Sequence, residues 1–383
     1  MSSRKYDAEE TQRYRTDSLV ESVRWAIKRF DKSPFTLAGE IFELYRGPGR
    51  LQPHEYFSFQ LYDDKKYPRE EKRRFLSELL HWKIAYVVSD PKWEALIEDK
   101  WVAYSFLHGE GFPVPTTSAV IDKTIRSFGK QRKIASPAEL RNFLSESATY
   151  PIFAKSNLGL GSFGAFMIAG IDGDRILLEN AESMSFDDLF ANVIGERTFL
   201  LQTRVQNDPA IRRFTNALAT VRTVNLVKAD EIVTPFTLLK IPAAKNIADN
   251  YWRPGNLLCN IDPASGVIKR VVRGKGINHE ELTHHPETGT PLVGTSLPHW
   301  RELRELNAAC ARLLAPIRYH SLDIAITENG PLVIEINFGG GFDLPQFATG
   351  KGILTDEIRG FFESCGYRFD RSFQPRRAAK KDG

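Results

Sequence analysis

The sequence predicts an α+β protein with mostly antiparallel sheets, preceded by a helical N-terminal region. Up to about residue 90, apolar residues recur at the spacing of amphipathic helices. Beyond that point strand-like segments dominate, and many follow one another without a helix between them. Strands that are neighbours in sequence pair through short turns as antiparallel hairpins, whereas a parallel pair needs a long crossover. The 383 residues are enough for roughly two or three packed units with a large core.

Local patterns define the helices. Apolar positions share one helical face in residues 19–30, 37–45 and 72–88. A further helix is expected at residues 91–108, ended by Gly109 and Gly111. Ser136, followed by Pro137 and Glu139, is typical of a helix start.

Strands fill most of the remaining chain. They are expected at residues 116–121, 150–156, 164–171, 197–205, 219–227, 233–241 and 256–262, before a long helix at 300–317. The expected organisation is a helical region in residues 1–90, a first mixed unit in 91–205, a second in 206–366 and a tail in 367–383.

The net charge of +4 comes from the tail. Apolar content of 42% and charged content of 26% are ordinary for a soluble globular protein. Residues 371–383 hold five basic residues and one acid, which accounts for the whole +4 and leaves the rest of the chain neutral. A basic tail this short is most simply a solvated, disordered terminus, so we do not expect a nucleic-acid partner.

The cysteines exclude two classes of protein. Cys259, Cys310 and Cys365 lie far apart and form no CxxC pair, which argues against a zinc site or a disulfide framework.

The N-terminus has no apolar leader, and no stretch reaches the roughly 18 apolar residues of a membrane span. We expect a soluble protein in a reducing cytoplasm.

The segment "LDIAITENGPLVIEIN", residues 322–337, places acids inside two strands that otherwise resemble core. Successive strand residues point to opposite faces, so Asp323 and Glu335 face away from their aliphatic neighbours. A three-residue turn at 328–330, with glycine at its last position, sets Asp323 opposite Glu335 and buries six aliphatic residues together. A two-residue Asn-Gly turn would instead set Asp323 against Ile336.

This register brings Asp323, Glu335 and Asn337 onto one face. Cross-strand neighbours lie only about 5 Å apart, and two anions that close repel unless a cation sits between them. Two carboxylates and an amide carbonyl form an all-oxygen ligand set that suits Mg²⁺. The alternative is an exposed polar face on an edge hairpin, because most charged side chains are simply solvated.

A glycine-rich turn connects two expected strands in "FAKSNLGLGSFGAFMIA", with glycines at 159, 161 and 164. A dinucleotide fingerprint needs a helix after the glycines, and a strand follows here. The backbone N–H groups of such a flap can close over phosphates, and Lys155 lies in the strand that enters it. The alternative is a surface hairpin with a solvated lysine.

The order of these features resembles the ATP-grasp superfamily, and more narrowly its sugar-transfer-associated branch. A lysine after a helix (Lys100) is followed by Lys155 with the glycine flap, then "FLLQTRV", then "TVRTV", then Asp…Glu-x-Asn. The segments "ADNYWRPGNLLCNID", "HHPETGTPLVG" and "HSLDIAITENGPLVIEINFGGGFDLPQ" add to the likeness, which covers roughly residues 35–365. The resemblance implies an ATP-grasp fold, in which two α+β subdomains clasp ATP.

The resemblance also implies roles for individual residues. Lys100 and Lys155 would hold the α and β phosphates, and Gln202 would contact adenine. Arg222 would grip the γ-phosphate or the reaction intermediate. The lid would consist of Gly159, Gly161, Ser162 and Gly164, and two Mg²⁺ ions would be held by Asp323, Glu335 and Asn337. A strand arginine can equally be a salt-bridge member, and Gln202 can be a satisfied core amide.

The chain departs from the family pattern near the expected acceptor site. Lys240 stands where relatives tend to have arginine, and we count it with Arg222 as catalytic. Asn256 stands where they often have a second glycine, and "VQNDP" lacks an expected histidine. Asn250 and His285 match family positions and complete the expected substrate residues, although a histidine in a turn-rich loop can equally be structural. These departures affect substrate identity more than nucleotide chemistry.

The resemblance implies an ATP-dependent carboxylate–amine ligase that works through an acyl-phosphate, with ATP and Mg²⁺ as cofactors. A sugar or a small amino-acid-like compound is the expected substrate class, and polysaccharide biosynthesis the expected context. Two other classes stay open: a small-molecule kinase on the same scaffold and a non-catalytic nucleotide-binding module. Residues 1–90 would shape the acceptor pocket or form the interface of a homodimer.

Overall fold

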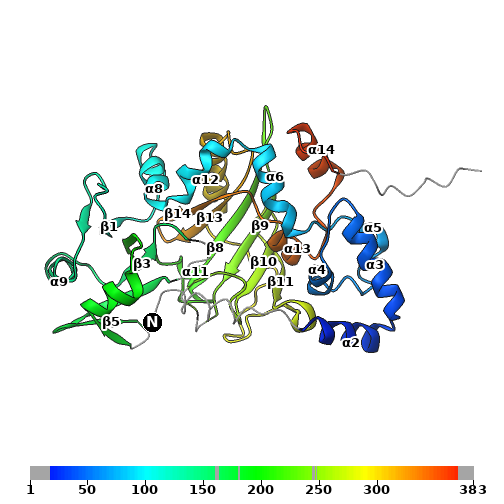
Figure 1. Cartoon of the computed structure of the whole chain (residues 1–383), viewed down its shortest axis with the longest axis horizontal. Helices are drawn as coiled ribbons and strands as arrows, with labels where there is room; N and C mark the ends of the chain where they lie inside the picture. Colours follow the sequence, from blue (N-terminus) through cyan, green and yellow to red (C-terminus); the bar gives the residue numbers. More distant parts are fainter. Residues whose placement is uncertain (1–17, 160–163, 180–181, 244–245, 247, 370–383) are drawn as a thin grey trace, which may run out of the picture.

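Two seven-stranded sheets organise the described part of the chain (Figure 1). The computed structural model describes residues 18–159, 164–179, 182–243, 246 and 248–369. The first sheet has the order β2-β1-β7-β3-β4-β5-β6 and the second the order β12-β11-β10-β9-β8-β13-β14. Every pairing in both sheets is antiparallel except that of β1 with β2. The expected α+β class with mostly antiparallel sheets is therefore confirmed.

The strands of each sheet come from a separate part of the sequence. The first sheet contains β1 (Thr117–Ile121), β2 (Arg132–Ile134), β3 (Ile152–Ser156), β4 (Phe166–Asp172), β5 (Arg175–Leu178), β6 (Ser183–Ser185) and β7 (Phe199–Thr203). The second contains β8 (Thr220–Val227), β9 (Ile232–Ile241), β10 (Leu257–Ile261), β11 (Ile268–Arg273), β12 (Glu280–Leu282), β13 (Tyr319–Thr327) and β14 (Gly330–Phe338).

Helices surround the sheets. The N-terminal region contains α2 (Leu19–Phe30), α3 (Pro34–Arg46), α4 (Pro53–Ser58), α5 (Arg69–Lys72), the 3₁₀-helix η1 (Glu78–Leu80) and α6 (His81–Val88). The 3₁₀-helix η2 (Pro91–Trp93), α7 (Glu94–Glu98), α8 (Lys100–Gly109), α9 (Pro137–Glu146), α10 (Phe186–Asp188) and the π-helical η3 (Leu189–Ile194) precede β7. The remaining helices are α11 (Pro209–Arg212), the 3₁₀-helix η4 (Gly276–Asn278), α12 (Trp300–Leu313), α13 (Asp343–Thr349) and α14 (Asp356–Ser364).

Two of the expected helices are broken, and both corrections concern residues near the site. The helix expected at 91–108 stops at Asp99, which is extended and whose carboxylate accepts from the Val102 N–H at 3.1 Å, so a new helix starts at Lys100. In the segment expected as one helix at 72–88, α5 ends at Lys72 and helical structure resumes only after Ser77. In between, Phe75 packs with the N-terminal helices on one face of the second sheet, while Leu76 packs in the cluster on the opposite face, which a straight helix does not allow.

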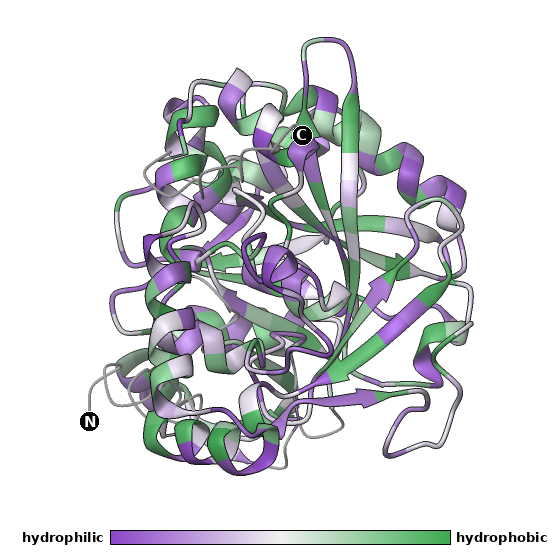
Figure 2. Cartoon of the chain, turned by 90° about the vertical axis from the view of Figure 1, so that its right-hand side faces the viewer, coloured by the Kyte–Doolittle hydropathy of each residue, from purple (hydrophilic) through white to green (hydrophobic). Residues whose placement is uncertain are grey.

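Apolar clusters join the N-terminal helices to the second sheet. One cluster combines Leu44, Tyr62 and Phe75 with sheet residues such as Leu258 and Val272. The helices α2 to α5 therefore cover one end of the second sheet, on the right in Figure 1. Figure 2 views the molecule from that side, and its helices carry alternating green and purple stretches because only one side of each meets the core. No helix in the described residues is long and apolar enough to cross a membrane.

The hairpin of β13 and β14 pairs Asp323 with Glu335 as predicted, but through a different turn. Thr327 pairs with Gly330, so the turn has two residues rather than three. A bulge on β14 then inserts Ile334 as an extra residue and restores the pairing of the two acids. Because the bulge changes which residues face inward, Val333 is fully buried while Ile334 is only half-buried, so the expected single aliphatic face is wrong for this strand.

Candidate active site

A row of charged residues crosses one face of the second sheet. Asp323 on β13 lies directly opposite Arg222 on β8 and directly opposite Glu335 on β14. Directly opposed residues in antiparallel strands point to the same face. The ladder pattern therefore aligns the three side chains as a row, which we call the charge row.

Arg222 and Lys240 hold the Asp323 carboxylate. The Arg222 guanidinium donates to both carboxylate oxygens, at 2.8 and 2.7 Å, and Lys240 donates to one of them at 3.0 Å. Asp323 is 3% exposed. Burial alone would raise the pKa of Asp323, but the charges and hydrogen bonds of the two cations outweigh it and hold the pKa well below its usual value.

Lys240 also joins the charge row to the segment before β10. Its Nζ lies 3.1 Å from the carboxylate of Asp249, which in turn accepts a hydrogen bond from the Thr220 hydroxyl. Lys240 is 4% exposed, so its position is fixed between two carboxylates. Lys240 therefore lies beside the charge row and contacts its central residue, Asp323.

Lys100 connects the charge row to the glycine flap. Its Nζ lies 3.1 Å from Glu335 and donates to the Gly159 carbonyl at 2.7 Å. Gly159 has a φ of +153°, which side chains rarely permit, and Gly164 has a φ of +70°. Gly161 and Ser162, also predicted for the flap, lie outside the described residues.

Lys155 reaches the site through a tyrosine. Its ammonium donates to the hydroxyl of Tyr104 on α8 and lies 4.9 Å from the centre of the same ring. The Tyr104 hydroxyl donates to the carbonyl of Ile334, the bulged residue of β14, at 2.5 Å. Burial lowers the pKa of Lys155 to about 8, against the opposing effect of the carboxylates of Glu335 and Asp249.

Two adjoining cavities border these side chains. The larger, of about 470 Å³, is lined by the whole charge row together with Lys100, Lys240 and Asn337. The smaller, of about 70 Å³, is lined by Lys100, Lys155, Asp323 and Glu335 and by Ile334 at the bulge. The structure thus brings together the predicted lysines, the arginine and the hairpin acids.

The donor set of the charge row fits a magnesium ion. Asp323 Oδ2 accepts two of the three hydrogen bonds and Oδ1 only one, so Oδ1 keeps a lone pair. The one ion pair that Glu335 makes in the described part of the chain, with Lys100, leaves carboxylate lone pairs available. The amide nitrogen of Asn337 is buried without a partner, so that side chain can reorient to offer its oxygen.

Three residues predicted for the site, Gln202, His285 and Asn256, line neither of the two cavities. Gln202 is 2% exposed and donates to Thr117 at 3.2 Å, and it lines neither cavity. His285 is 2% exposed, and its Nδ1 accepts the backbone N–H groups of Glu287 and Thr288, so it supports a turn. His285 serves local structure in this arrangement, whereas Gln202 also forms a hydrogen bond with Tyr104.

Asn256 also makes its hydrogen bonds within its own loop. Its oxygen accepts from the Ala243 N–H at 2.8 Å, and its nitrogen donates to the carbonyls of Ala248 and Asn250 at 3.0 and 2.7 Å. The loop it holds presents Asn250, which does line the larger cavity. Asn256 thus acts on the cavity through the loop backbone.

Several residues of the cavity were not predicted. Tyr104 lies on an expected helix with no motif around it, and Asp249 directly precedes the predicted Asn250, which is the one available signal. The larger cavity is also lined by Glu78, His81 and Asp343, which come from the N-terminal helices and the start of α13.

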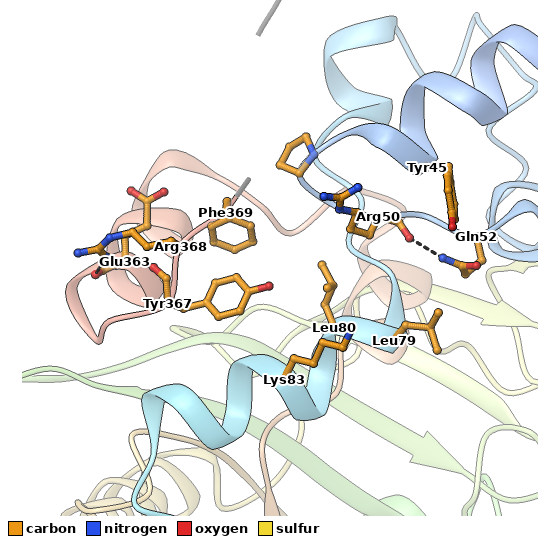
Figure 3. Close-up of a pocket in the computed structure, with 11 residues that line it drawn as sticks. Tyr45, Arg50, Gln52, Leu79, Leu80, Lys83, Glu363, Tyr367, Arg368 and Phe369 are labelled. Carbon is orange, nitrogen blue, oxygen red and sulfur yellow. Dashed lines mark hydrogen bonds between the residues drawn. The ribbon is translucent and has the colours of Figure 1, made fainter. Parts of the chain in front are cut away.

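A separate hollow of about 930 Å³ lies between the N-terminal helices and the segment around α14 (Figure 3). Figure 3 shows Tyr367 reaching toward Leu80 between its two walls, with Arg50 and Lys83 on the N-terminal side. None of the residues predicted for the site lines this hollow. Its size alone therefore does not make it the active site.

Two mostly antiparallel sheets, with lysines suited to phosphate and a hairpin that carries two carboxylates beside two adjoining cavities, are typical of the ATP-grasp class. Within that class the chain belongs to the sugar-transfer associated ATP-grasp family, whose model matches residues 87–359, more than half of the chain. The resemblance noted from the sequence is thereby confirmed. Among curated proteins, no sequence match was found.

Solved structures show distant similarity. Biotin carboxylase of Campylobacter jejuni is 13% identical with a TM-score of 0.43, over 77% of this chain and 53% of that one. The D-Ala:D-Ser ligase VanG of Enterococcus faecalis is 16% identical with a TM-score of 0.39, over 72% and 64%. N5-carboxyaminoimidazole synthase of Aspergillus clavatus is 13% identical with a TM-score of 0.36, over 70% and 51%. The chain thus matches about half to two-thirds of the length of these proteins.

Proposed function

We propose that the protein is an ATP-dependent ligase that joins a carboxylic acid to an amine through an acyl-phosphate. The observation that carries this proposal is the charge row with its lysines. Lys100, Lys155, Arg222 and Lys240 converge on the two cavities, beside the carboxylates of Asp249, Asp323 and Glu335. Lysine and arginine side chains grouped with oxygen ligands suit a triphosphate that binds together with Mg²⁺.

Lys100 and Lys155 are the proposed phosphate ligands. Both lie beside the glycine flap, and Lys100 already contacts its first glycine through the Gly159 carbonyl. A phosphate next to Lys155 would raise its pKa and keep the ammonium charged. The two lysines would thereby fix the nucleotide against the first sheet.

Glu335, Asn337 and the remaining lone pair of Asp323 are the proposed magnesium ligands. Oxygen ligands of this kind suit Mg²⁺, which commonly completes its coordination with phosphate oxygens and water. When bound, the metal neutralises charge on the phosphoryl group during transfer. Lys100 would then leave Glu335 and bind phosphate instead.

Arg222 and Lys240 are proposed to orient the acid substrate and the phosphoryl group. An oxygen of the acid attacks the γ-phosphorus, and ADP leaves with the bonding electron pair. The amine nitrogen then attacks the activated carbonyl carbon, the C–O bond to phosphate breaks, and phosphate leaves. No enzyme nucleophile is required, and burial raises the pKa of all three cysteine thiols, which disfavours a thiolate.

The requirement for both substrates tests the proposal. We expect ADP release only when the protein receives ATP, Mg²⁺, an acid and an amine together, and mass spectrometry of a pooled panel should show the condensed product. ADP release with a single hydroxyl compound and no acid would identify a kinase instead. Nucleotide binding without any turnover across the panel would contradict the ligase.

A further inference from the structure

We propose that the amine substrate binds in the larger cavity against Glu78 and Asp343, with its carbon skeleton on Trp82. This inference rests on the proposed ligase function and adds a substrate class to it: a primary amine carried by a ring or another flat apolar body. It also makes the segment from Glu78 to Val88 part of the active site.

The position of Glu78 is set by the turn that follows β14. One oxygen of its carboxyl group accepts the backbone N–H groups of Phe342 and Asp343, at 2.8 and 3.2 Å. The turn comes close because Gly339, with a φ of +79°, has no side chain; a Cβ there would lie 2.2 Å from Nε2 of His81. The N-terminal helices and the end of the charge-row hairpin therefore form one continuous cavity wall.

Glu78 and Asp343 have no cationic partner among the described residues, since the His81 ring, whose Nδ1 lies 3.5 Å from Glu78, is neutral at pH 7. Burial and the neighbouring Asp343 raise the pKa of Glu78 to about 8, and burial also raises the pKa of Asp343. No lysine or arginine in the described residues forms an ion pair with either group, whereas Asp249, Asp323 and Glu335 each have one. A bound ammonium would supply the missing positive charge.

The groups packed around this pair do not supply that charge. Glu55 from α4 adds a further carboxylate, and the buried Tyr319 hydroxyl from β13 is neutral because burial raises its pKa. Arg222 affects Asp343 from a distance, but its guanidinium is engaged by Asp323. The environment therefore favours a cationic ligand over an anionic one.

His81 is a second, independent sign of a ligand. It is 7% exposed and lines the cavity, and its Nε2 has no hydrogen-bond partner in the described part of the chain. Burial and the nearby Arg222 lower the pKa of His81 to about 4, so the ring is neutral at pH 7. The neutral ring thus leaves this buried nitrogen, which lies against Gly339, with an acceptor lone pair that no described residue satisfies.

Aromatic side chains form the rest of this wall. Trp82 is stacked on Phe338 with ring centres 6.5 Å apart and on Tyr86 at 5.6 Å, and it remains 40% exposed. Tyr251 and Trp252 also line the cavity. Aromatic faces attract cations and pack well against flat apolar groups, which is why we assign them the carbon skeleton next to the amine.

In the reaction, the ammonium gives one proton to the carboxylate of Glu78 and becomes a free amine. The amine nitrogen attacks the acyl-phosphate carbon, the C–O bond breaks and phosphate leaves with the electron pair. The second proton passes from nitrogen to the departing phosphate, and Glu78 later releases its proton to solvent. The step needs no other reactant.

Binding of a simple amine tests the site without turnover. Benzylammonium chloride is titrated calorimetrically into the full chain with Mg²⁺ and a non-hydrolysable ATP analogue, and benzyl alcohol serves as the uncharged probe. We expect the amine to bind more tightly than the alcohol, and Glu78→Gln to weaken the amine at least about tenfold. Glutamine keeps the carbonyl oxygen that holds the turn, so folding should survive.

Matched controls separate the site from general effects. Trp82→Ala should also weaken the amine, whereas Trp25→Ala, at a tryptophan of similar exposure on α2, should not. Glu363→Gln, in the separate hollow of Figure 3, should bind as the wild type does. Equal affinity of Glu78→Gln and wild type, or preference of the wild type for the alcohol, would overturn the proposal. Failure of the ligase function would appear instead as absent acid-dependent ADP release, whatever the amine affinity.

Discussion

One cluster of paired charges in the N-terminal helices and another along the charge row differ in what lies next to them. In the N-terminal cluster, Lys32 and Lys72 each contact both Glu40 and Asp64, at distances of 2.5 to 2.9 Å. Both lysines are nearly buried. None of these residues lines the cavities of the site or the separate hollow.

The N-terminal cluster satisfies its charges internally, whereas the charge row borders a cavity. The N-terminal cluster has two cations and two acids, and the Tyr56 hydroxyl donates to Glu40 at 2.5 Å. Burial alone would raise the pKa of Glu40, but the hydrogen bonds it accepts outweigh burial and lower it. The charge row lines an open cavity, together with Lys100 and Lys240. A buried ion pair is therefore weak evidence for function, whereas charged groups that line an open cavity point to a ligand.

The largest expected effect comes from breaking the charge row. Glu335→Ala should lower ATP turnover about a thousandfold, because a proposed magnesium ligand is lost and with it the neutralisation of charge on the phosphoryl group. The fold should survive, since Lys100 keeps its hydrogen bond to the Gly159 carbonyl. Glu328→Ala, at the exposed turn of the same hairpin, is the control and should turn over normally. Turnover of Glu335→Ala at the wild-type rate would remove the metal-site assignment.

Breaking the N-terminal cluster should lower stability and leave turnover unchanged. Glu40→Ala leaves two buried lysines with one shared acid, and we expect the free energy of unfolding to fall by about 3 kcal/mol in urea denaturation. ADP release per folded molecule should stay unchanged. Glu21→Ala, on the exposed face of α2, should change stability by less than about 0.5 kcal/mol. Lost turnover with full stability in Glu40→Ala would show that the comparison is wrong.

The pairing of Asp323 with Glu335 was predictable, but the turn was not. Alternation of faces and burial of aliphatic residues restrict the register strongly, so the acids had to share a face. The bulge at Ile334 comes with a contact distant in sequence, since the Ile334 carbonyl accepts a hydrogen bond from Tyr104 on α8. A local pattern contains no information about such a partner.

The acceptor side of the cavity was missed for a similar reason. Residues 72–88 have the apolar spacing of one helix, which would leave Glu78 as a solvated side chain. The helix breaks because Phe75 and Leu76 belong to different cores, and the break turns Glu78 and His81 into the cavity. Conversely, Asn256 resembles a binding residue in sequence, yet its loop satisfies its amide.

The Tyr104 hydroxyl links the first sheet to the second, so its removal tests whether Lys155 binds phosphate. Tyr104→Phe removes the hydroxyl that links Lys155 to the Ile334 carbonyl, and we expect the KM for ATP to rise about tenfold, since a hydrogen bond to a charged group is lost. Tyr150→Phe is the control, because its hydroxyl donates to the Leu144 carbonyl within the first unit. An unchanged KM for ATP in Tyr104→Phe would argue against a phosphate-binding Lys155.

The smallest expected effect concerns the pH dependence of stability, which should have opposite signs for Glu78 and Glu40. The pKa of Glu78 is raised to about 8, so its contribution to stability is complete below the unfolded value of about 4.3 and is lost as pH rises through 8. The pKa of Glu40 is lowered, so its contribution to stability is present above the unfolded pKa and is lost as pH falls through the folded pKa.

Relative to Glu78→Gln, the wild type should therefore lose about 1 kcal/mol of unfolding free energy between pH 6 and pH 9. The figure is small because 42% of the Glu78 side chain is exposed. Relative to Glu40→Gln, the wild type should lose stability only on acidification toward pH 3. Urea unfolding of the three proteins at pH 3, 6 and 9 measures both differences, and the same sign in both comparisons would mean that Glu78 has a cationic partner after all.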